Sequence, residues 1–240
     1  MKLLLLGGTS EARALAKRLH PDIELISSLA GRVPDPALPV GPVRIGGFGG
    51  VDGLRRYLQD NEITAVVDAT HPFAANITAN AARACAGLRL PHLVLARPAW
   101  PHGDAMVVAD DRQAARTVKD HDYQRVFLTT GRSGTTAFRE SDAWFLIRAV
   151  TPPDAETLPP RHEILLSRGP YDYDNELALL RDHRIDALVT KNSGGGMTRA
   201  KLDAAVALKI PVIMVNRPAL PAGVTTVATV AEAEAWVRAR

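Results

Sequence analysis

The stretch that decides the fold lies at the beginning of the chain, where residues 2–16 read KLLLLGGTSEARALA. Four leucines form a short apolar run, two glycines follow, and the next residues have the composition of a helix with a polar start. A buried strand, a glycine turn and a helix in this order are typical of parallel α/β sheets. The first amides of such a helix, together with its dipole, favour an anion at the turn.

Similar strand-like runs alternate with helix-length segments along the rest of the chain, which places the protein in the α/β class. The expected strands are 2–6, 23–28, 65–68, 92–95, 126–130, 145–150, 163–167, 187–190 and 212–215, and the expected helices include 11–19, 52–60 and 175–182.

The two halves of the chain resemble each other. Residues 90–101 (LPHLVLARPAWP) recur as residues 210–221 (IPVIMVNRPALP), displaced by 120 positions. Buried strands look alike by chance, but the shared Arg-Pro-Ala-x-Pro ending favours a true repeat. We therefore expect two similar doubly wound, Rossmann- or flavodoxin-like domains. The first, residues 1–100, is expected to bind a dinucleotide. The second, residues 101–240, is expected to bind a substrate, with the connection within residues 98–124 and a ligand cleft between the domains.

Composition narrows the classes of function. The chain has 240 residues and a net charge of +3, and no apolar run approaches the roughly 20 residues that span a bilayer. The leucine run at the start is too short for a secretory signal, and the single Cys85 excludes an internal disulfide, so a cytoplasmic protein is expected. Arginines are scattered and aromatic residues make up only 5%, which argues against nucleic acid as a partner. A small anionic ligand fits the basic balance, and we expect a monomer or a small homo-oligomer.

The first glycine turn is the strongest candidate for a cofactor site, with Gly7, Gly8, Thr9, Ser10 and Glu11 as its residues. The match to the dinucleotide fingerprint is imperfect, because a threonine stands where the second glycine normally lets the backbone approach the pyrophosphate. The hydroxyls of Thr9 and Ser10 are candidates for those contacts. A tight turn with a capping hydroxyl is the simpler alternative.

The end of the second expected strand bears on the choice of cofactor. An NAD site usually places an acid there, whereas this chain continues with Ser28, Gly31 and Arg32. Ser28 and Arg32 are therefore candidates for binding a 2′-phosphate, which favours NADPH over NADH, although a surface arginine in a loop is an ordinary alternative. Gly46 and Gly47, at the next crossover, would let the backbone approach a ligand closely.

The third segment of interest follows the strand 65–68. Pro72 suits the first turn of a helix, and His71 is left at the carboxyl end of the sheet, where ligands of open α/β sheets bind. His71 and Pro72 are candidates for contact with the cofactor, His71 is also a candidate for contact with substrate, and a capping or purely structural histidine is the alternative.

In the second half, two loops follow expected strands and offer polar groups to an anion. Their candidate residues for substrate binding are Arg132, Lys191, Asn192, Ser193 and Gly194. Lys191 precedes its glycines, so the loop does not match a phosphate-binding Walker pattern, and a solvent-exposed glycine loop is the alternative. No metal-ligand spacing and no nucleophile triad emerges, so no metal site is expected and no catalytic residue is assigned.

Taken in order along the chain, these motifs resemble the precorrin-6A reductase family of cobalamin biosynthesis. The resemblance rests on residues 7–12 (GGTSEA), 30–32 (AGR), 68–74 (DATHPFA), 168–170 (RGP) and 191–195 (KNSGG). It implies an oxidoreductase that uses NADPH to reduce one ring double bond of precorrin-6A, giving precorrin-6B, with an anionic tetrapyrrole-derived substrate.

The resemblance leaves three matters open. A similar enzyme reduces cobalt-precorrin-6A, so the cobalt content of the substrate is undecided. The proton donor is also unassigned, with Asp172 and Asp174 as the first residues to test. A non-catalytic NADPH-sensing module and a cofactor-free lyase or synthase are the rival classes.

Overall fold

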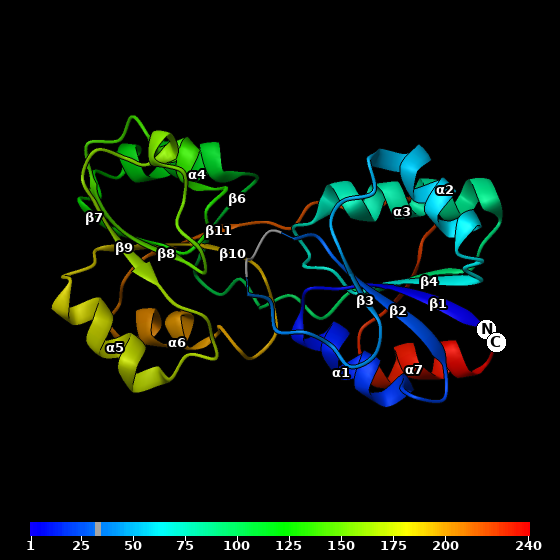
Figure 1. Ribbon diagram of the computed structural model, residues 1–240. Coiled ribbons are helices and arrows are strands. Elements are labelled where there is room, and N and C mark those ends of the chain that lie inside the picture. The colour runs from blue at the N-terminus through cyan, green and yellow to red at the C-terminus, as the bar shows by residue number, and fades with distance from the viewer. Residues whose placement is uncertain (32–34) are drawn as a thin grey trace. The chain divides into compact units, whose positions relative to one another are not determined.

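The computed structural model describes residues 1–31 and 35–240 and consists of two units. Unit 1 comprises residues 1–98 and 218–240, and unit 2 comprises residues 99–217. Each unit contains one six-stranded sheet in which all neighbouring strands are parallel, with helices on both faces (Figure 1). The α/β class and the two doubly wound sheets expected from the sequence are confirmed.

Unit 1 has the strand order β12-β5-β4-β1-β2-β3. With β12 counted as the sixth strand, this is the order of dinucleotide-binding sheets. Its elements are β1 (Lys2–Leu6), α1 (Ser10–Leu19), β2 (Glu24–Leu29), β3 (Val43–Ile45), α2 (Gly50–Asp60), β4 (Ala65–Asp68), α3 (Ala75–Leu88), β5 (His92–Leu95), β12 (Thr225–Val227) and α7 (Val230–Arg238).

Unit 2 has the order β6-β11-β10-β7-β8-β9. Its elements are β6 (Met106–Val108), α4 (Asp111–Asp120), β7 (Arg125–Leu128), the 3-10 helix η1 (Thr135–Phe138), β8 (Trp144–Ala149), the 3-10 helix η2 (Ala155–Thr157), β9 (His162–Leu166), α5 (Tyr173–Asp182), β10 (Ala187–Lys191), α6 (Ala200–Ala207) and β11 (Val212–Val215).

The two sheets have the same order, and the units exchange the edge strand and helix that complete them. The segment that follows β5 in the chain supplies β6 and α4 to unit 2, whereas the segment that follows β11 supplies β12 and α7 to unit 1. β12 pairs with β5, and β6 pairs with β11. Each exchanged strand thereby pairs with what would otherwise be the edge strand of the other unit's sheet.

This exchange differs from the expected division into residues 1–100 and 101–240. Residues 218–240 belong to unit 1, because Ala233 and Val237 of α7 pack with Leu15 and Leu19 of α1 in one buried core. Residues 99–124 are likewise an integral part of unit 2 rather than a connection, since they carry β6, α4 and the buried Trp100.

Apolar clusters on the two faces of each sheet explain the layers. In unit 1, Leu3 and Leu5 of β1 face α1 and α7, while Leu4 and Leu6 face α2 and α3. This alternation follows from the two-residue period of a strand that is buried on both faces. In unit 2, one face of the sheet packs against α5 and α6. The rigid sheets leave the loops at their carboxyl edges to carry the chemistry.

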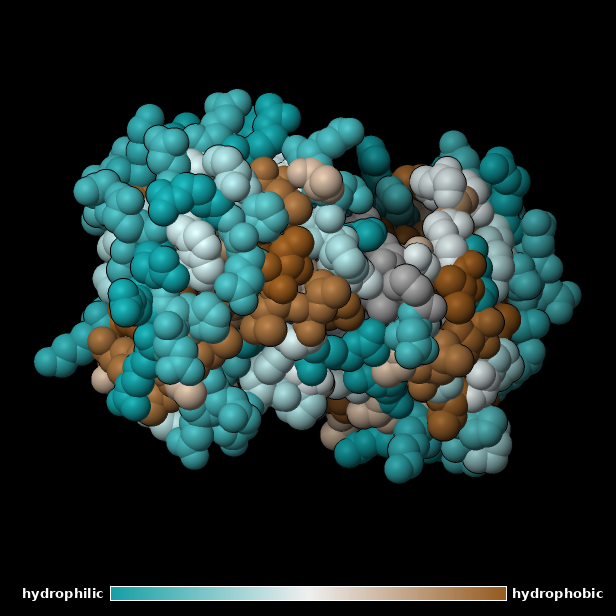
Figure 2. Space-filling view, turned by 60° about the vertical axis from the view of Figure 1, so that its left-hand side comes forward, coloured by the Kyte–Doolittle hydropathy of each residue, from teal (hydrophilic) through white to brown (hydrophobic). Residues whose placement is uncertain are grey.

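The described part of the chain contains no helix that is both long and apolar enough to cross a membrane. The face seen in Figure 2 is mainly hydrophilic, with apolar side chains gathered in separate patches.

Candidate functional site

The glycine turn of unit 1 joins β1 directly to α1. The Gly7 amide donates to the Ser28 carbonyl at 2.9 Å, which ties the turn to the end of β2. Gly8 has φ +110°, a value that favours glycine, and a Cβ added there would meet nothing within 4 Å. The Thr9 hydroxyl is buried, accepts from the Ala12 amide at 3.1 Å and donates to the Ala69 carbonyl at 2.7 Å. This hydroxyl therefore caps α1 with its donor already used, and its contact with a ligand stays a prediction.

Glu11, in the first turn of α1, forms an ion pair with Arg97 at 2.9 Å. Ser10 donates a hydrogen bond to the same carboxylate oxygen at 3.0 Å. Burial opposes ionisation, but the Arg97 charge and the hydrogen bonds outweigh it and lower the pKa of Glu11. The predicted cofactor residue Glu11 thus anchors the start of α1 to the segment after β5.

The ends of β2 and β3 bring together Ser28 and Arg44, a residue that sequence reasoning missed as a site residue. The Arg44 guanidinium donates to the Ser28 hydroxyl at 3.0 Å and to the carbonyls of Gly46 at 2.8 Å and Gly47 at 3.0 Å. An arginine two residues before a glycine run was the available signal. The expected Arg32 lies outside the described residues, and its role stays a prediction.

The other predicted glycines of this edge shape loops. A Cβ at Gly31 would lie 3.1 Å from the Ile45 side chain, so this glycine permits the loop to pack against β3. Gly46 has φ +126°, and a Cβ at Gly47 would meet nothing within 4 Å, which leaves its surroundings open. Among the glycines predicted at this edge, Gly8 and Gly47 are therefore the two with open space around them.

The turn after β4 is held by Asp68, which is 1% exposed. One Asp68 carboxylate oxygen accepts from the Thr70 amide at 3.0 Å and from the Thr70 hydroxyl at 2.7 Å. His71 follows, and its Nδ1 accepts from the Phe73 amide at 3.2 Å. A neutral His71 ring must therefore carry its proton on Nε2. The turn gives His71 a defined tautomer, as a residue that positions or donates a proton requires.

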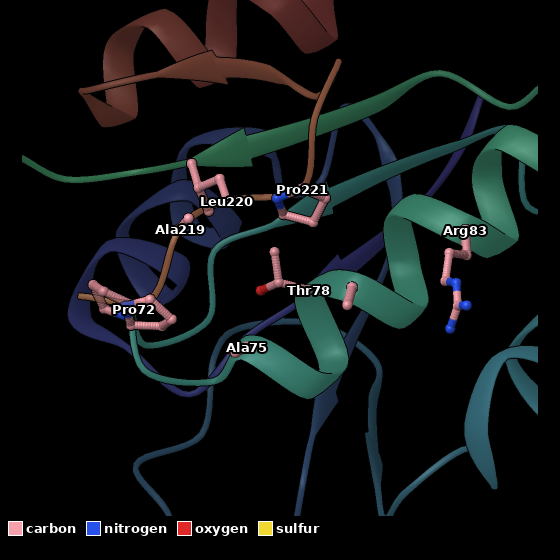
Figure 3. A pocket seen from close by; sticks show the side chains of 9 residues that line it. Pro72, Ala75, Thr78, Arg83, Ala219, Leu220 and Pro221 are labelled. Atoms are coloured by element: carbon pink, nitrogen blue, oxygen red, sulfur yellow. The ribbon is translucent and has the colours of Figure 1, made fainter. Parts of the chain in front are cut away.

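A groove of about 390 Å³ in unit 1 begins at Pro72 and follows one face of α3 (Figure 3). Ala75, Thr78 and Arg83 line it from α3, and residues 218–221 line it from the segment that leads to β12. The lining is mostly apolar and small, with Arg83 as its one charged residue. The groove adjoins the His71 turn and offers an apolar flank beside it.

Taken together, the edge of unit 1 fits a dinucleotide. The open space at Gly8 lies beside the start of a ten-residue helix, whose amides before Ala12 have no intrahelical acceptor. Among the described residues 24–31 the only acid is Glu24, at the opposite end of β2. These residues can hold a pyrophosphate at the turn and leave the ribose end without a repelling carboxylate.

The corresponding turn of unit 2 has Thr129 and Thr130 directly after β7, where unit 1 has Gly7 and Gly8 after β1, while a Cβ added at Gly131 would meet nothing within 4 Å. Thr130 is 4% exposed, and the backbone of Gly134 packs directly against its side chain. The short η1 helix follows where unit 1 has α1. Arg132 is exposed at this turn, so of the residues predicted here it is the one whose side chain faces solvent.

Lys191, at the end of β10, folds back onto this turn. Its ammonium donates to the Thr130 carbonyl at 2.8 Å and lies 3.7 Å from an Asp111 carboxylate oxygen. Burial raises the pKa of Asp111, while the Lys191 charge opposes that rise. The cation predicted for substrate binding is therefore already engaged within unit 2, at the carboxyl edge of the sheet.

Asn192 is fully buried and holds the residues that enter unit 2. Its side-chain amide exchanges two hydrogen bonds with the Trp100 backbone, at 2.9 and 3.0 Å. The backbone carbonyl of Asn192 accepts from the Arg217 side chain at 2.8 Å. The side chain of Asn192 has a structural partner for both of its polar atoms. Ser193 is half-buried and Gly194 has φ +65°, so the loop turns sharply immediately after Asn192.

A buried charged cluster beneath this loop was not foreseen. Arg148 and Glu176 form a two-pronged ion pair at 2.7 and 2.8 Å, with exposures of 7% and 2%. Lys201 donates to the Thr198 carbonyl at 2.6 Å and lies over the Trp100 ring. Burial, with the Arg148 charge, lowers the pKa of Lys201 to about 7. The arginine inside the apolar run 145–149 was the signal for this cluster.

The two candidate proton donors lie at the start of α5. Asp172 caps the helix by accepting from the amides of Asp174 and Asn175 at 2.9 and 3.2 Å, and Asp174 is exposed. Asp172 thus caps α5, and the assignment of the proton donor stays a prediction. Among the described residues no group of three His, Cys, Asp or Glu side chains is arranged to hold a metal.

Comparison with known proteins shows which family this chain resembles in sequence and fold. Residues 2–238 match the family model "Precorrin-6x reductase CbiJ/CobK". The chain is 66% identical to the precorrin-6A reductase of Mycobacterium tuberculosis H37Rv, covering 98% of this chain and 97% of that protein, and 55% identical to that of Rhodococcus erythropolis, with the same coverages. A cobalt-precorrin-6A reductase of Methanothermobacter thermautotrophicus is 32% identical, over 91% of this chain and 77% of that protein.

A solved structure described as CobK precorrin-6A reductase superposes with a TM-score of 0.92 and 38% identity, covering all of this chain and 97% of that one. The family model, the relatives and the fold agree over nearly the whole length. The chain therefore belongs to the precorrin-6x reductase CbiJ/CobK family.

Proposed function

We propose that this chain reduces precorrin-6A to precorrin-6B and that NADPH is the reductant. The observation that carries the proposal is the open glycine turn at Gly8, in a chain 66% identical to a precorrin-6A reductase. The higher identity to precorrin-6A reductases than to the cobalt-precorrin-6A reductase, 66% against 32%, favours the cobalt-free substrate.

Unit 1 is the proposed cofactor side. Gly7 and Gly8 keep the turn free of side chains, and the first amides of α1 bind the pyrophosphate. Bound NADPH supplies a hydride, and the chain orients the ring and compensates charge. His71, with its proton on Nε2 when neutral, can donate a hydrogen bond at the same edge of the sheet.

Unit 2 is the proposed substrate side. Arg132 is exposed at the turn after β7, and Lys191, at the end of β10, contacts the Thr130 carbonyl of the same turn. Cations at this edge suit the acetate and propionate groups of a tetrapyrrole-derived substrate. Ser193 and Gly194 are the predicted substrate contacts of the loop after β10, while Asn192 keeps this loop in place through Trp100.

The test is an assay of the purified protein with NADPH and precorrin-6A. It measures the loss of the reduced cofactor and the appearance of precorrin-6B. Parallel reactions contain NADH in place of NADPH, or cobalt-precorrin-6A in place of precorrin-6A. Oxidation of NADPH only when precorrin-6A is present supports the proposal. Cofactor binding without turnover would instead indicate a sensing module, and failure to bind any nicotinamide cofactor would favour a lyase or synthase.

A further inference from the structure

Arg44 is held at the carboxyl edge of unit 1 in one orientation. Three hydrogen bonds fix two of its nitrogens, with Nη1 donating to Ser28 and Gly46 and Nη2 to Gly47. The guanidinium lies 3.9 Å from the centre of the Phe48 ring and 5.0 Å from that of Tyr57. The two aromatic rings therefore help to hold the guanidinium in this orientation, with its N–H donors in its own plane.

The charge of Arg44 has no acidic partner among the described residues. All its acceptors are neutral oxygens, one hydroxyl and two carbonyls. A guanidinium has five N–H donors, and these bonds use three of them. The Nε–H and one Nη2–H are not used by these bonds, and guanidinium donors of this kind bind phosphate groups.

Ser28 connects Arg44 to the glycine turn. Its carbonyl accepts from the Gly7 amide at 2.9 Å, and its hydroxyl accepts from Arg44 at 3.0 Å. The register places Ser28 beside both Leu6 of β1 and Arg44 of β3. The guanidinium is thus separated from the pyrophosphate turn by a single residue at the end of β2, where the adenosine ribose lies in sheets of this order.

We infer that Arg44 recognises the 2′-phosphate of the nicotinamide cofactor and that Ser28 positions it for that contact. The inference rests on the proposed function and names the residue that makes this unit select NADPH over NADH. It assigns to Arg44, through observed contacts, the role that the sequence pattern assigned to Arg32.

The experiment measures dissociation constants of NADPH and NADH, and of adenosine 2′,5′-bisphosphate and AMP, by calorimetry without turnover. The variants are Arg44→Met, Arg44→Lys, Ser28→Ala and Arg32→Met. Arg56→Met is the matched control, because Arg56 is an exposed arginine on the neighbouring α2. Circular dichroism and thermal unfolding check each fold.

Loss of a charge-assisted phosphate contact should weaken NADPH and the bisphosphate by about tenfold to a hundredfold in Arg44→Met. NADH and AMP should change less than about threefold, since they lack the phosphate. Arg44→Lys keeps the charge without the planar fork and should fall between, Ser28→Ala should show a smaller loss of the same kind, and Arg56→Met should behave as the parent.

Full preference for NADPH in Arg44→Met, or in a folded Arg44→Lys if the methionine variant unfolds, would overturn the inference. So would transfer of the whole effect to Arg32→Met. A parent protein that binds neither NADPH nor the bisphosphate would instead contradict the proposed function, and the two failures are therefore distinguishable.

Discussion

The turn after the first strand differs between the two units, although their sheets have the same order. In unit 1 it contains Gly7 and Gly8 and leads into the ten-residue α1. In unit 2 it contains the buried Thr130 and leads into the four-residue η1. Unit 1 thus places two glycines before a ten-residue helix, whereas unit 2 places a buried threonine before a short 3-10 helix, although Gly131 there also has open space around it. The sheet order is therefore repeated, but the pair of glycines and the long helix after the first strand are not.

The charges beneath the two edges differ as well. Unit 2 buries Arg148, Glu176 and Lys201 within a few residues of its loops. Unit 1 holds Arg44 at its sheet edge through hydrogen bonds to neutral oxygens. Its ion pair of Glu11 and Arg97 is partly exposed, with side-chain exposures of 22% and 15%. Buried charges depend on one another, whereas a partly exposed pair is stabilised by water too.

The largest effect should come from breaking the buried pair. Glu176→Gln leaves Arg148 and Lys201 without a carboxylate, and we expect a loss of about 3–5 kcal/mol in the free energy of unfolding. The matched change Glu11→Gln in unit 1 should cost about 1 kcal/mol. Urea unfolding followed by tryptophan fluorescence measures both, because Trp100 and Trp144 report on unit 2 and Trp236 on unit 1. Equal losses would contradict the contrast between the units.

The next effect concerns the two turns. Gly8→Val and Gly131→Val both place a side chain at a positive φ, +110° and +76°, so each should strain its turn by about 1–3 kcal/mol. Only Gly8→Val occupies the proposed pyrophosphate position and should weaken NADPH by more than about tenfold. Titration of both folded variants with NADPH checks this. Similar weakening in the two would show that the turn of unit 2 also contacts the cofactor.

The smallest effect is a pH dependence that unit 2 owes to Lys201. Its folded pKa of about 7 lies below the unfolded value of 10.5, so the unfolded chain binds more protons between these values. Stability should therefore rise with pH above about 7, by at most about 2 kcal/mol between pH 6.5 and 8.5. Lys201→Met should remove this rise, and the exposed Lys119→Met should keep it. Thermal unfolding across the range tests the expectation, which fails if the parent shows no such slope.

The long apolar runs were sufficient to locate most of the sheet. The expected strands 2–6, 65–68, 92–95 and 212–215 coincide with β1, β4, β5 and β11. The strands that were not foreseen are β3, β6 and β12, each of three residues at or near a sheet edge. A strand this short has too few positions for a period to be read, and its partner decides its conformation.

The candidate site, too, was predictable in one part and not in another. The glycine turn was recognisable because a glycine after a buried strand leaves a local signature, as at Gly8. The partners of Asn192 and Lys191 were not, since a polar residue after a strand looks the same whether it meets a ligand or its own chain. Both prove to be paired within unit 2, with Trp100 and Thr130. Arg44 has no signature beyond the glycines that follow it.

The sequence by itself determined the class of fold, the repeat of two doubly wound sheets, the turn at Gly7 and Gly8, and the family. These depend on apolar period, on glycine geometry and on motif order, all of which are properties of neighbouring residues. Only the tertiary structure decided that β6 and β12 change units and that Ser28 meets Arg44. Edge pairing and side-chain partners join residues far apart in the chain, and their free energy comes from contacts that exist only once the sheets have formed.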